Sequence, residues 1–269
     1  MKKIRFKSGA VRVIGWSFTM IAFVIFLGFA DRSYDQRASN GLRISVKDAE
    51  QNYFIEPVDI EEILNARGRK LRGMSMDDIN IPMLEKLIYT NEYVDRAEVY
   101  STIDGYVNID VWQRNPVVRI INSQNEHYYI DENGGFMPVS SKFSKPVVVA
   151  NGYIFDRYRQ KSLNFASEFP GDTAADPLLV QIYEVARFIR DDEFWNSQIE
   201  QIYVNESFDL ELIPRVGDHR IIIGSSAGLE EKLEKLMVFY EKGVSRAGWN
   251  NYSVINLKYK DQVVCRKHN

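Results

Sequence analysis

The stretch "VDRAEVYSTIDGYVNIDVWQRNPV", residues 94–117, decides the fold of the first half of the chain. Its runs 94–100 and 106–112 alternate apolar and polar side chains, which predicts two β-strands that each bury one face. Three apolar residues share one face of the second run: Val107, Ile109 and Val111. Asp104-Gly105 lies between the runs, where antiparallel strands need a tight turn. The stretch therefore predicts a β-hairpin.

The segments before this hairpin complete one compact unit. Residues 42–46, LRISV, are a short apolar run that predicts a strand. Pro57 then opens a helical pattern that stops before Gly68, and Asn80 is an N-cap residue type at the start of a second helical pattern. Apolar residues recur at helical spacing in both patterns: Ile60, Ile63, Leu64, Met83, Leu84, Leu87 and Ile88. The order strand, helix, helix, strand, strand predicts an α+β unit with both helices on one sheet face.

The residues after the hairpin distinguish one protein family better than the strand alternation does, because that alternation is common. Arg114-x-Pro116-Val117 follows the second strand directly. Together with the hairpin pattern, this motif resembles the POTRA domain of the bacterial cell-division family FtsQ, also called DivIB. The resemblance implies a POTRA domain over residues 42–116, with the element order β-α-α-β-β.

Another hairpin is predicted just beyond residue 116. Asn133-Gly134 lies between two short runs in "HYYIDENGGFMPV", residues 127–139, and Asn-Gly is a strong signal for a tight hairpin turn. Five residues of this segment occupy positions that are typical of FtsQ proteins: Tyr129, Asp131, Gly134, Phe136 and Pro138. The segment strengthens the resemblance and carries it into the second half of the chain.

The remaining patterns predict a second domain, residues 117–265, that is mostly antiparallel β-sheet with two helices. The helices are predicted over 177–191 and 228–242, and residues 152–176 are interpreted as a loop insertion. Four further runs predict strands: 145–152, 198–204, 208–214 and 220–224. The last four residues, 266–269, are predicted to be a short tail.

The chain finishes with another hairpin signal. Apolar side chains alternate from Ile255 to Tyr259, the polar pair Lys260-Asp261 follows, and a β-prone run begins at Val263. A hairpin at the end of the chain places one strand at the rim of a sheet, where backbone N–H and C=O groups are unpaired on one side. An extended segment of another protein can add itself to such an edge.

The N-terminal region predicts a single membrane anchor. Residues 1–12 contain five basic residues and no acid, and residues 13–30 are 18 residues without a charge. As a helix this span is about 27 Å long, against a hydrocarbon thickness of about 30 Å. A buried helix would show a polar stripe, and a cleavable signal peptide, suggested by Gly28-Phe29-Ala30, would have a shorter apolar core. The flanking charges predict a cytoplasmic N-terminus and an ectodomain in the periplasm.

Composition and motifs argue against catalysis and nucleic-acid binding. Without its basic first twelve residues the chain is more acidic than its net charge of −3, whereas phosphate binding needs a positive surface. His127, His219 and His268 lie in separate predicted elements, and the one cysteine, Cys265, leaves no disulfide or multi-thiolate site within these 269 residues. No nucleophile elbow or phosphate-binding loop occurs. We therefore expect no enzyme activity, metal, cofactor or small-molecule substrate.

The FtsQ resemblance assigns the function to a surface. It implies a non-enzymatic scaffold of the divisome, in the inner membrane at the division septum. The implied partners are the division proteins FtsB, called DivIC elsewhere, and FtsL. By position, Lys258 and Tyr259 correspond to the family's basic residue and tyrosine. The family's partner-binding edge strand corresponds to four residues: Gln262, Val263, Val264 and Cys265.

Alternatives stay open at this point. The terminal hairpin alone would also serve to close the core, with Lys258 an ordinary solvated lysine. Lys258 also replaces the arginine more familiar in the family, and a lysine lacks bidentate geometry. A different class of function is a POTRA-type chaperone or translocation module for envelope proteins. A cell-wall hydrolase would need a clustered His/Asp or Ser/His set, which the sequence lacks.

Overall fold

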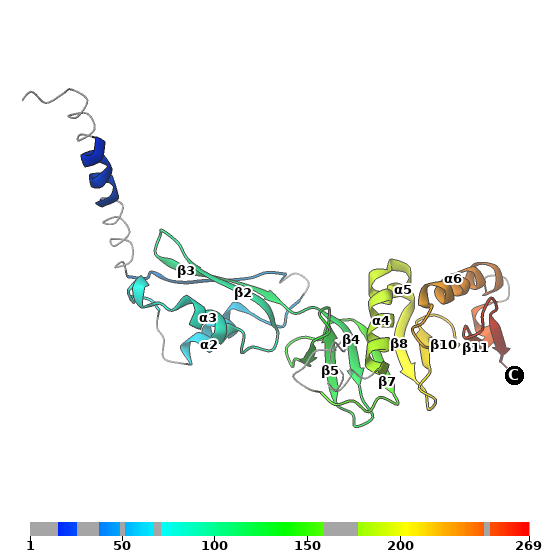
Figure 1. Cartoon of the computed structure of the whole chain (residues 1–269). Coiled ribbons are helices and arrows are strands. Elements are labelled where there is room, and N and C mark those ends of the chain that lie inside the picture. The colour runs from blue at the N-terminus through cyan, green and yellow to red at the C-terminus, as the bar shows by residue number, and fades with distance from the viewer. Residues whose placement is uncertain are drawn as a thin grey trace, which may run out of the picture. The chain divides into compact units, whose positions relative to one another are not determined.

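A computed structural model describes residues 16–25, 38–48, 52–66, 71–158, 177–244 and 248–268 of the chain (Figure 1). The chain divides into two compact units. The first contains Met1–Ala49 and Ile55–Gln113, and the second contains Glu50–Phe54 and Arg114–Asn269. The short segment 50–54 thus belongs to the second unit although it lies between two parts of the first in sequence.

Only part of the predicted anchor falls within the described residues. Residues 16–25 form a helix, whereas 13–15 and 26–30 lie outside the described residues. Across the described ranges, no helix combines the length and the apolar character that a membrane crossing requires. The 13–30 anchor therefore stays a prediction from the sequence.

The first unit contains the predicted order of elements. Its sheet consists of β1 (Gly41–Val46), β2 (Val94–Ser101) and β3 (Tyr106–Gln113), in the order β1-β3-β2. β2 and β3 form the predicted antiparallel hairpin, and β1 pairs with β3 in parallel. Val107, Ile109 and Val111 are completely buried, as their alternation predicts. Gly105 in the turn has φ +82°, a conformation that favours glycine.

Two helices supply the rest of this core. Helix α2 (Pro57–Asn65) begins at a proline, and α3 (Ile81–Ile88) begins after Asn80. The Asn80 Oδ1 atom accepts a hydrogen bond from the Met83 N–H at 2.9 Å, so Asn80 caps α3 as predicted. A short 3₁₀ turn, η1 (Met76–Asp78), precedes it. Five residues of the two helices are buried in this core: Ile60, Leu64, Leu84, Leu87 and Ile88.

Within the described part of the second unit, nine strands form one sheet in the order β12-β11-β10-β9-β8-β7-β4-β5-β6. Five of its strand pairs are antiparallel and three are parallel. The strands that come first in the chain are β4 (Pro116–Ile121), β5 (His127–Asp131), β6 (Phe136–Pro138) and β7 (Val148–Gly152). The later ones are β8 (Ile199–Val204), β9 (Leu210–Pro214), β10 (Arg220–Gly224), β11 (Tyr252–Asn256) and β12 (Val264–Lys267).

Helices cover this sheet and bury its core (Figure 1). Helix α4 (Pro177–Asp191) and helix α6 (Leu229–Phe239) fall where the sequence predicts helices, and a π-helical turn, η2 (Tyr240–Val244), continues α6. A 3₁₀ turn, η3 (Trp249–Asn251), leads into β11. The helical residues in the core include Leu179, Ile182, Ala186, Leu233 and Leu236.

The prediction of two helices in this unit was incomplete. A third helix, α5 (Glu193–Gln198), follows α4 directly. Asp192 caps it by accepting a hydrogen bond from the Trp195 N–H at 2.9 Å, and Trp195 is buried. Three consecutive acidic residues, Asp191, Asp192 and Glu193, therefore mark a helix junction, because Asp192 follows one helix and caps the next.

The motif residues that resemble FtsQ meet in one buried ion pair. The Arg114 Nε atom lies 2.6 Å from Asp131 Oδ2, and Arg114 Nη1 donates to the Phe136 carbonyl at 3.0 Å. Asp131 also accepts hydrogen bonds from the N–H groups of Asn133 and Gly135 in the hairpin turn. The motif therefore joins the start of the second unit to the turn between β5 and β6.

Candidate partner-binding edge and groove

Strand β12 lies at one margin of the nine-stranded sheet. It pairs with β11 in antiparallel register, with Cys265 opposite Ile255 and Val264 opposite Asn256. Among the described residues, no side chain accepts a hydrogen bond from a backbone N–H of β12. The edge expected from the sequence is therefore present, although β12 spans Val264–Lys267. Gln262 and Val263 lie in the preceding loop rather than in the strand.

The loop 257–263 connects β11 to β12 and is anchored at its start. Leu257 is completely buried, and its N–H donates to the Ile222 carbonyl of β10 at 2.9 Å. The Lys258 N–H donates to Asn256 Oδ1 at 3.0 Å. At the turn itself Asp261 has φ +58°, in the left-handed region that Asp tolerates better than most residues. The predicted Lys260-Asp261 turn is thus confirmed.

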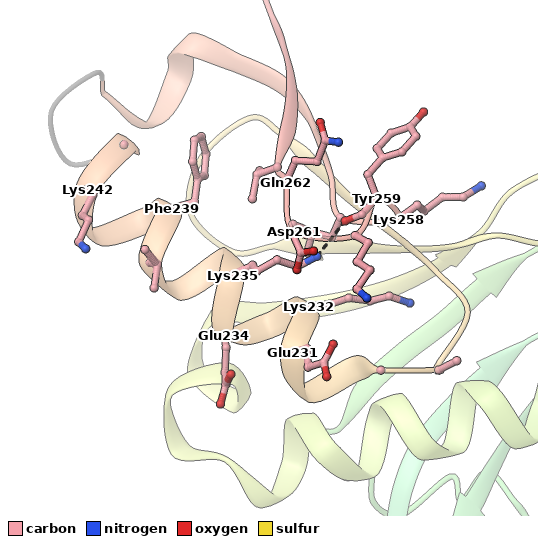
Figure 2. Close-up of a pocket in the computed structure, with 17 residues that line it drawn as sticks. Glu231, Lys232, Glu234, Lys235, Phe239, Lys242, Lys258, Tyr259, Asp261 and Gln262 are labelled. Carbon is pink, nitrogen blue, oxygen red and sulfur yellow. Dashed lines mark hydrogen bonds between the residues drawn. The ribbon is translucent and has the colours of Figure 1, made fainter.

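A groove of about 810 Å³ lies between this loop and helix α6 (Figure 2). Its apolar side chains include Val238, Phe239, Leu257 and Val263. Five lysines line it, three from α6 and η2 and two from the loop: Lys232, Lys235, Lys242, Lys258 and Lys260. Three carboxylates line it as well: Glu231, Glu234 and Asp261. The groove is thus positive by charge count, in contrast to the acidic chain as a whole.

Lys258 is held by two contacts within the chain. Its Nζ atom lies 2.5 Å from Asp209 Oδ2, in the turn before β9. Its aliphatic stem lies over Gly224, where an added Cβ atom would lie 3.0 Å from Lys258 Cγ. Gly224 also has φ +74°, so glycine both relieves backbone strain and leaves space for the lysine stem.

Tyr259 presents its side chain to solvent, with 51% of its surface exposed. Its carbonyl accepts a hydrogen bond from Lys235 Nζ at 2.9 Å, which joins the loop to α6 (Figure 2). The loop backbone is therefore fixed while the aromatic ring remains available to a partner. A tyrosine ring offers both an apolar face and a polar hydroxyl for such a contact.

The other four predicted residues differ in exposure. Gln262 is exposed and Val264 is 43% exposed, whereas Val263 and Cys265 are half-buried and pack against the core. Burial raises the pKa of the Cys265 thiol. For Val264 and Cys265 the difference follows from strand geometry, because successive side chains of a strand point to opposite faces.

The sequence did not single out the α6 residues that complete the groove. Lys232 Nζ donates to the Ser225 carbonyl at 2.8 Å, and burial lowers its pKa below the ordinary lysine value. Lys232, Lys235 and Val238 lie on the polar face of an amphipathic helix, a pattern that is typical of any surface helix. The sequence shows the charge of that face, but it does not show that the loop 257–263 lies opposite it.

Two family models match the chain, and together they cover both units. The model described as POTRA-like domain matches residues 37–112. The model described as FtsQ/DivIB, C-terminal related, matches residues 115–266, which is more than half of the chain. The chain belongs to the FtsQ/DivIB-related family. This FtsQ/DivIB-like protein is thereby placed among bacterial cell-division proteins, a non-enzymatic family. No curated protein matches it.

Among the described residues of this FtsQ/DivIB-like protein, the histidines and acids are not arranged as a metal site. Within the described ranges, no three His, Cys, Asp or Glu side chains are grouped so that they could hold a metal ion. His219 is buried, with its Nε2 atom 2.9 Å from the Tyr240 hydroxyl. Burial lowers the pKa of His219 and raises that of Tyr240, so both groups are neutral near pH 7.

Proposed function

We propose that this protein is a divisome scaffold that binds a FtsB/DivIC-type protein, together with FtsL, by strand addition at β12. In this role it links assembly of the division machinery to septal peptidoglycan synthesis and performs no reaction itself. Residues 13–30 anchor it in the inner membrane, with the N-terminus in the cytoplasm and both units in the periplasm. The family supports the cell-division role, the charge-free span at 13–30 supports the anchor, and the open β12 edge carries the proposed strand addition.

Strand addition fits this edge for a specific reason. The backbone of a partner strand can complete the hydrogen bonds of β12, while its alternate side chains contact residues beside the edge. Val264 is exposed in the strand, and Tyr259 is exposed in the loop before it. Backbone pairing supplies affinity, and these side chains supply selectivity.

The groove predicts the charge of the partner segment. Its five lysines outnumber its three carboxylates, so a segment with acidic residues is favoured over a basic one. Apolar residues that line the groove, including Phe239 and Val263, accommodate an apolar side chain of the same segment. We therefore expect a partner strand in which acidic and apolar residues are adjacent.

Co-purification with the FtsB/DivIC-type protein of the same organism tests the proposal. In the full-length chain, Lys267→Pro removes a backbone N–H that faces away from β11, so partner recovery should fall by about tenfold or more. The double variant Lys258→Ala/Tyr259→Ala should also lose recovery, because it removes the charged and aromatic contacts beside the edge. Tyr100→Ala, which changes an exposed tyrosine of β2, is the matched control and should bind normally.

Unchanged recovery with both β12 and loop variants would contradict the proposed site, provided that circular dichroism shows each variant folded. Envelope fractionation tests the location separately. Recovery of the full-length chain in the soluble fraction would contradict the 13–30 anchor and would leave the edge proposal intact.

A further inference from the structure

The sheet of the first unit also ends at an edge strand, but side chains cover the backbone of that strand. The Ala97 N–H of β2 donates to the Tyr89 hydroxyl oxygen at 3.1 Å, and the Val99 N–H donates to Glu85 Oε1 at 3.2 Å. Glu85 lies in α3, and Tyr89 is its C-cap residue. An edge strand directs alternate N–H groups away from its sheet partner, and here two of those groups are already bonded.

We propose that Glu85 and Tyr89 block the β2 edge against strand pairing with the β2 edge of a second copy of this chain. The two acceptors occupy the N–H groups that a second strand would need. β12 differs, because among the described residues no side chain accepts from its backbone N–H groups. The blocked edge and the open edge lie in different units, so this inference does not depend on the proposed partner at β12.

A second copy is the occupant that the sequence of β2 favours. In an antiparallel pair centred on Ala97, Arg96 of one copy faces Glu98 of the other, and the same contact recurs by symmetry. Both side chains are more than half exposed, at 55% and 53%. Opposite charges that face each other across two strands stabilise the pair. The edge is therefore self-complementary once its N–H groups are free.

The length of β2 makes its edge a site for unwanted strand pairing. β2 is eight residues long, and long edge strands are templates for unwanted association unless charges, bulges or covering groups prevent it. A register shift between Val94 and Arg96 already interrupts the start of β2. The α3 side chains cover the regular part of the strand, which the shift does not affect.

The test measures self-association of the full-length chain in a mild detergent by light scattering. The double variant Glu85→Ala/Tyr89→Phe removes both acceptors, because phenylalanine has no hydroxyl and alanine has no carboxylate. It should form a dimer whose fraction rises with protein concentration, whereas the wild type stays monomeric. Glu85→Gln keeps a carbonyl acceptor, and Lys86→Ala changes a neighbouring residue of the same helix. Both controls should stay monomeric.

Charge exchange tests the register. Adding Glu98→Arg to the unblocked variant places like charges opposite each other and should weaken the dimer by about tenfold. Adding Arg96→Glu as well restores opposite charges and should restore the dimer. The proposal would be overturned if the unblocked variant stayed monomeric. It would also be overturned if Glu98→Arg did not change the affinity of the dimer.

Amide hydrogen exchange keeps the proposal testable if the double variant folds poorly. In Tyr89→Phe alone, the Ala97 amide should exchange about tenfold faster than in the wild type, with the Val99 amide unchanged. Equal exchange at Ala97 in the two proteins would show that the Tyr89 hydroxyl does not cover the edge. Either readout leaves partner binding at β12 unaffected, so failure here and failure of the proposed function are distinguishable.

Discussion

Lys258 and Asp209 form an ion pair across the end of the second sheet, with Nζ 2.5 Å from Oδ2. The pair joins the loop after β11 to the turn before β9. Its side chains are 43% and 26% exposed, so solvent reaches the lysine and weakens the pair. Under the proposed binding mode, a partner carboxylate at this position would compete with Asp209 for Lys258.

The first prediction follows from that competition. Asp209→Asn removes the internal competitor and leaves Lys258 in place, so the affinity for the FtsB/DivIC-type partner should rise by about threefold to tenfold. Isothermal titration with the wild type and the variant measures the change. Ser207→Ala, in the same turn, should leave the affinity unchanged. A lower affinity in Asp209→Asn would show that the pair orients Lys258 for binding.

Gly224 predicts a local effect on the groove. Gly224→Ala forces alanine to φ +74° and brings Cβ to 3.0 Å from Lys258 Cγ, so both strain and displacement of the lysine are expected. The free energy of unfolding should fall by about 1–2 kcal/mol, as urea unfolding would measure, and partner affinity in the titration should fall with it.

Gly73→Ala, in the first unit, is the matched control for this prediction. Gly73 also has a positive φ, +88°, but no atom lies within 4 Å of the position that a Cβ would take there, and Gly73 does not line the groove. The control should lose stability through backbone strain and keep its partner affinity. Equal losses of affinity in both variants would show that the loss does not arise from displacement of Lys258.

His219 predicts a pH dependence of stability. Burial lowers its pKa from the ordinary value of 6.5, against a smaller opposing effect of Asp218. The folded state therefore resists protonation, while the unfolded chain binds a proton as the pH falls below 6.5. Stability from the neutral histidine is present above that value and is lost as the pH falls towards the lower folded pKa.

Urea unfolding of the wild type and His219→Gln measures this effect. The wild type should lose more stability than the variant between about pH 7 and pH 5, because only the wild type carries the histidine. The carboxylates titrate in both proteins, so the comparison isolates His219. Identical pH profiles would contradict the assignment.

The buried pair Arg114–Asp131 predicts a large loss of stability. Asp131 is only 3% exposed in its side chain, so Arg114→Ala leaves a buried carboxylate without its cation. The expected cost is about 3 kcal/mol, at the lower end for a broken buried pair because two backbone N–H groups still bond Asp131. Arg187→Ala, which breaks an exposed pair with Asp191, should cost about 0.5 kcal/mol or less. Thermal or urea unfolding distinguishes the two variants.

Local sequence patterns predicted most of the elements. The alternation at 106–112 predicted a buried strand face correctly, because side chains in a strand point to opposite sides. Asn80 and Asn133-Gly134 marked a helix start and a turn through short-range hydrogen bonds and backbone preference. Helix α5 was missed because six residues carry too few turns for a clear helical period.

The candidate site was only partly predictable. The terminal hairpin and its residues Lys258 and Tyr259 follow from local alternation and family resemblance. The bounds of the last strand were predicted less well. Gln262 and Val263 lie in the loop, which includes Asp261 with its positive φ, and β12 begins at Val264. The α6 wall of the groove, with Lys232 and Lys235, depends on packing between segments that are distant in sequence.

By itself, the sequence determined the order of the elements, the charge-free span at 13–30, and the membership of two recognisable domain types, because each depends on neighbouring residues. Tertiary structure alone decided which edges stay open. Helix α3 and its C-cap supply acceptors to β2 from outside its sheet, whereas within the described residues the N–H groups of β12 meet no side-chain acceptor. Edge availability depends on backbone groups and their neighbours in space, and no pattern of side chains along one strand records it.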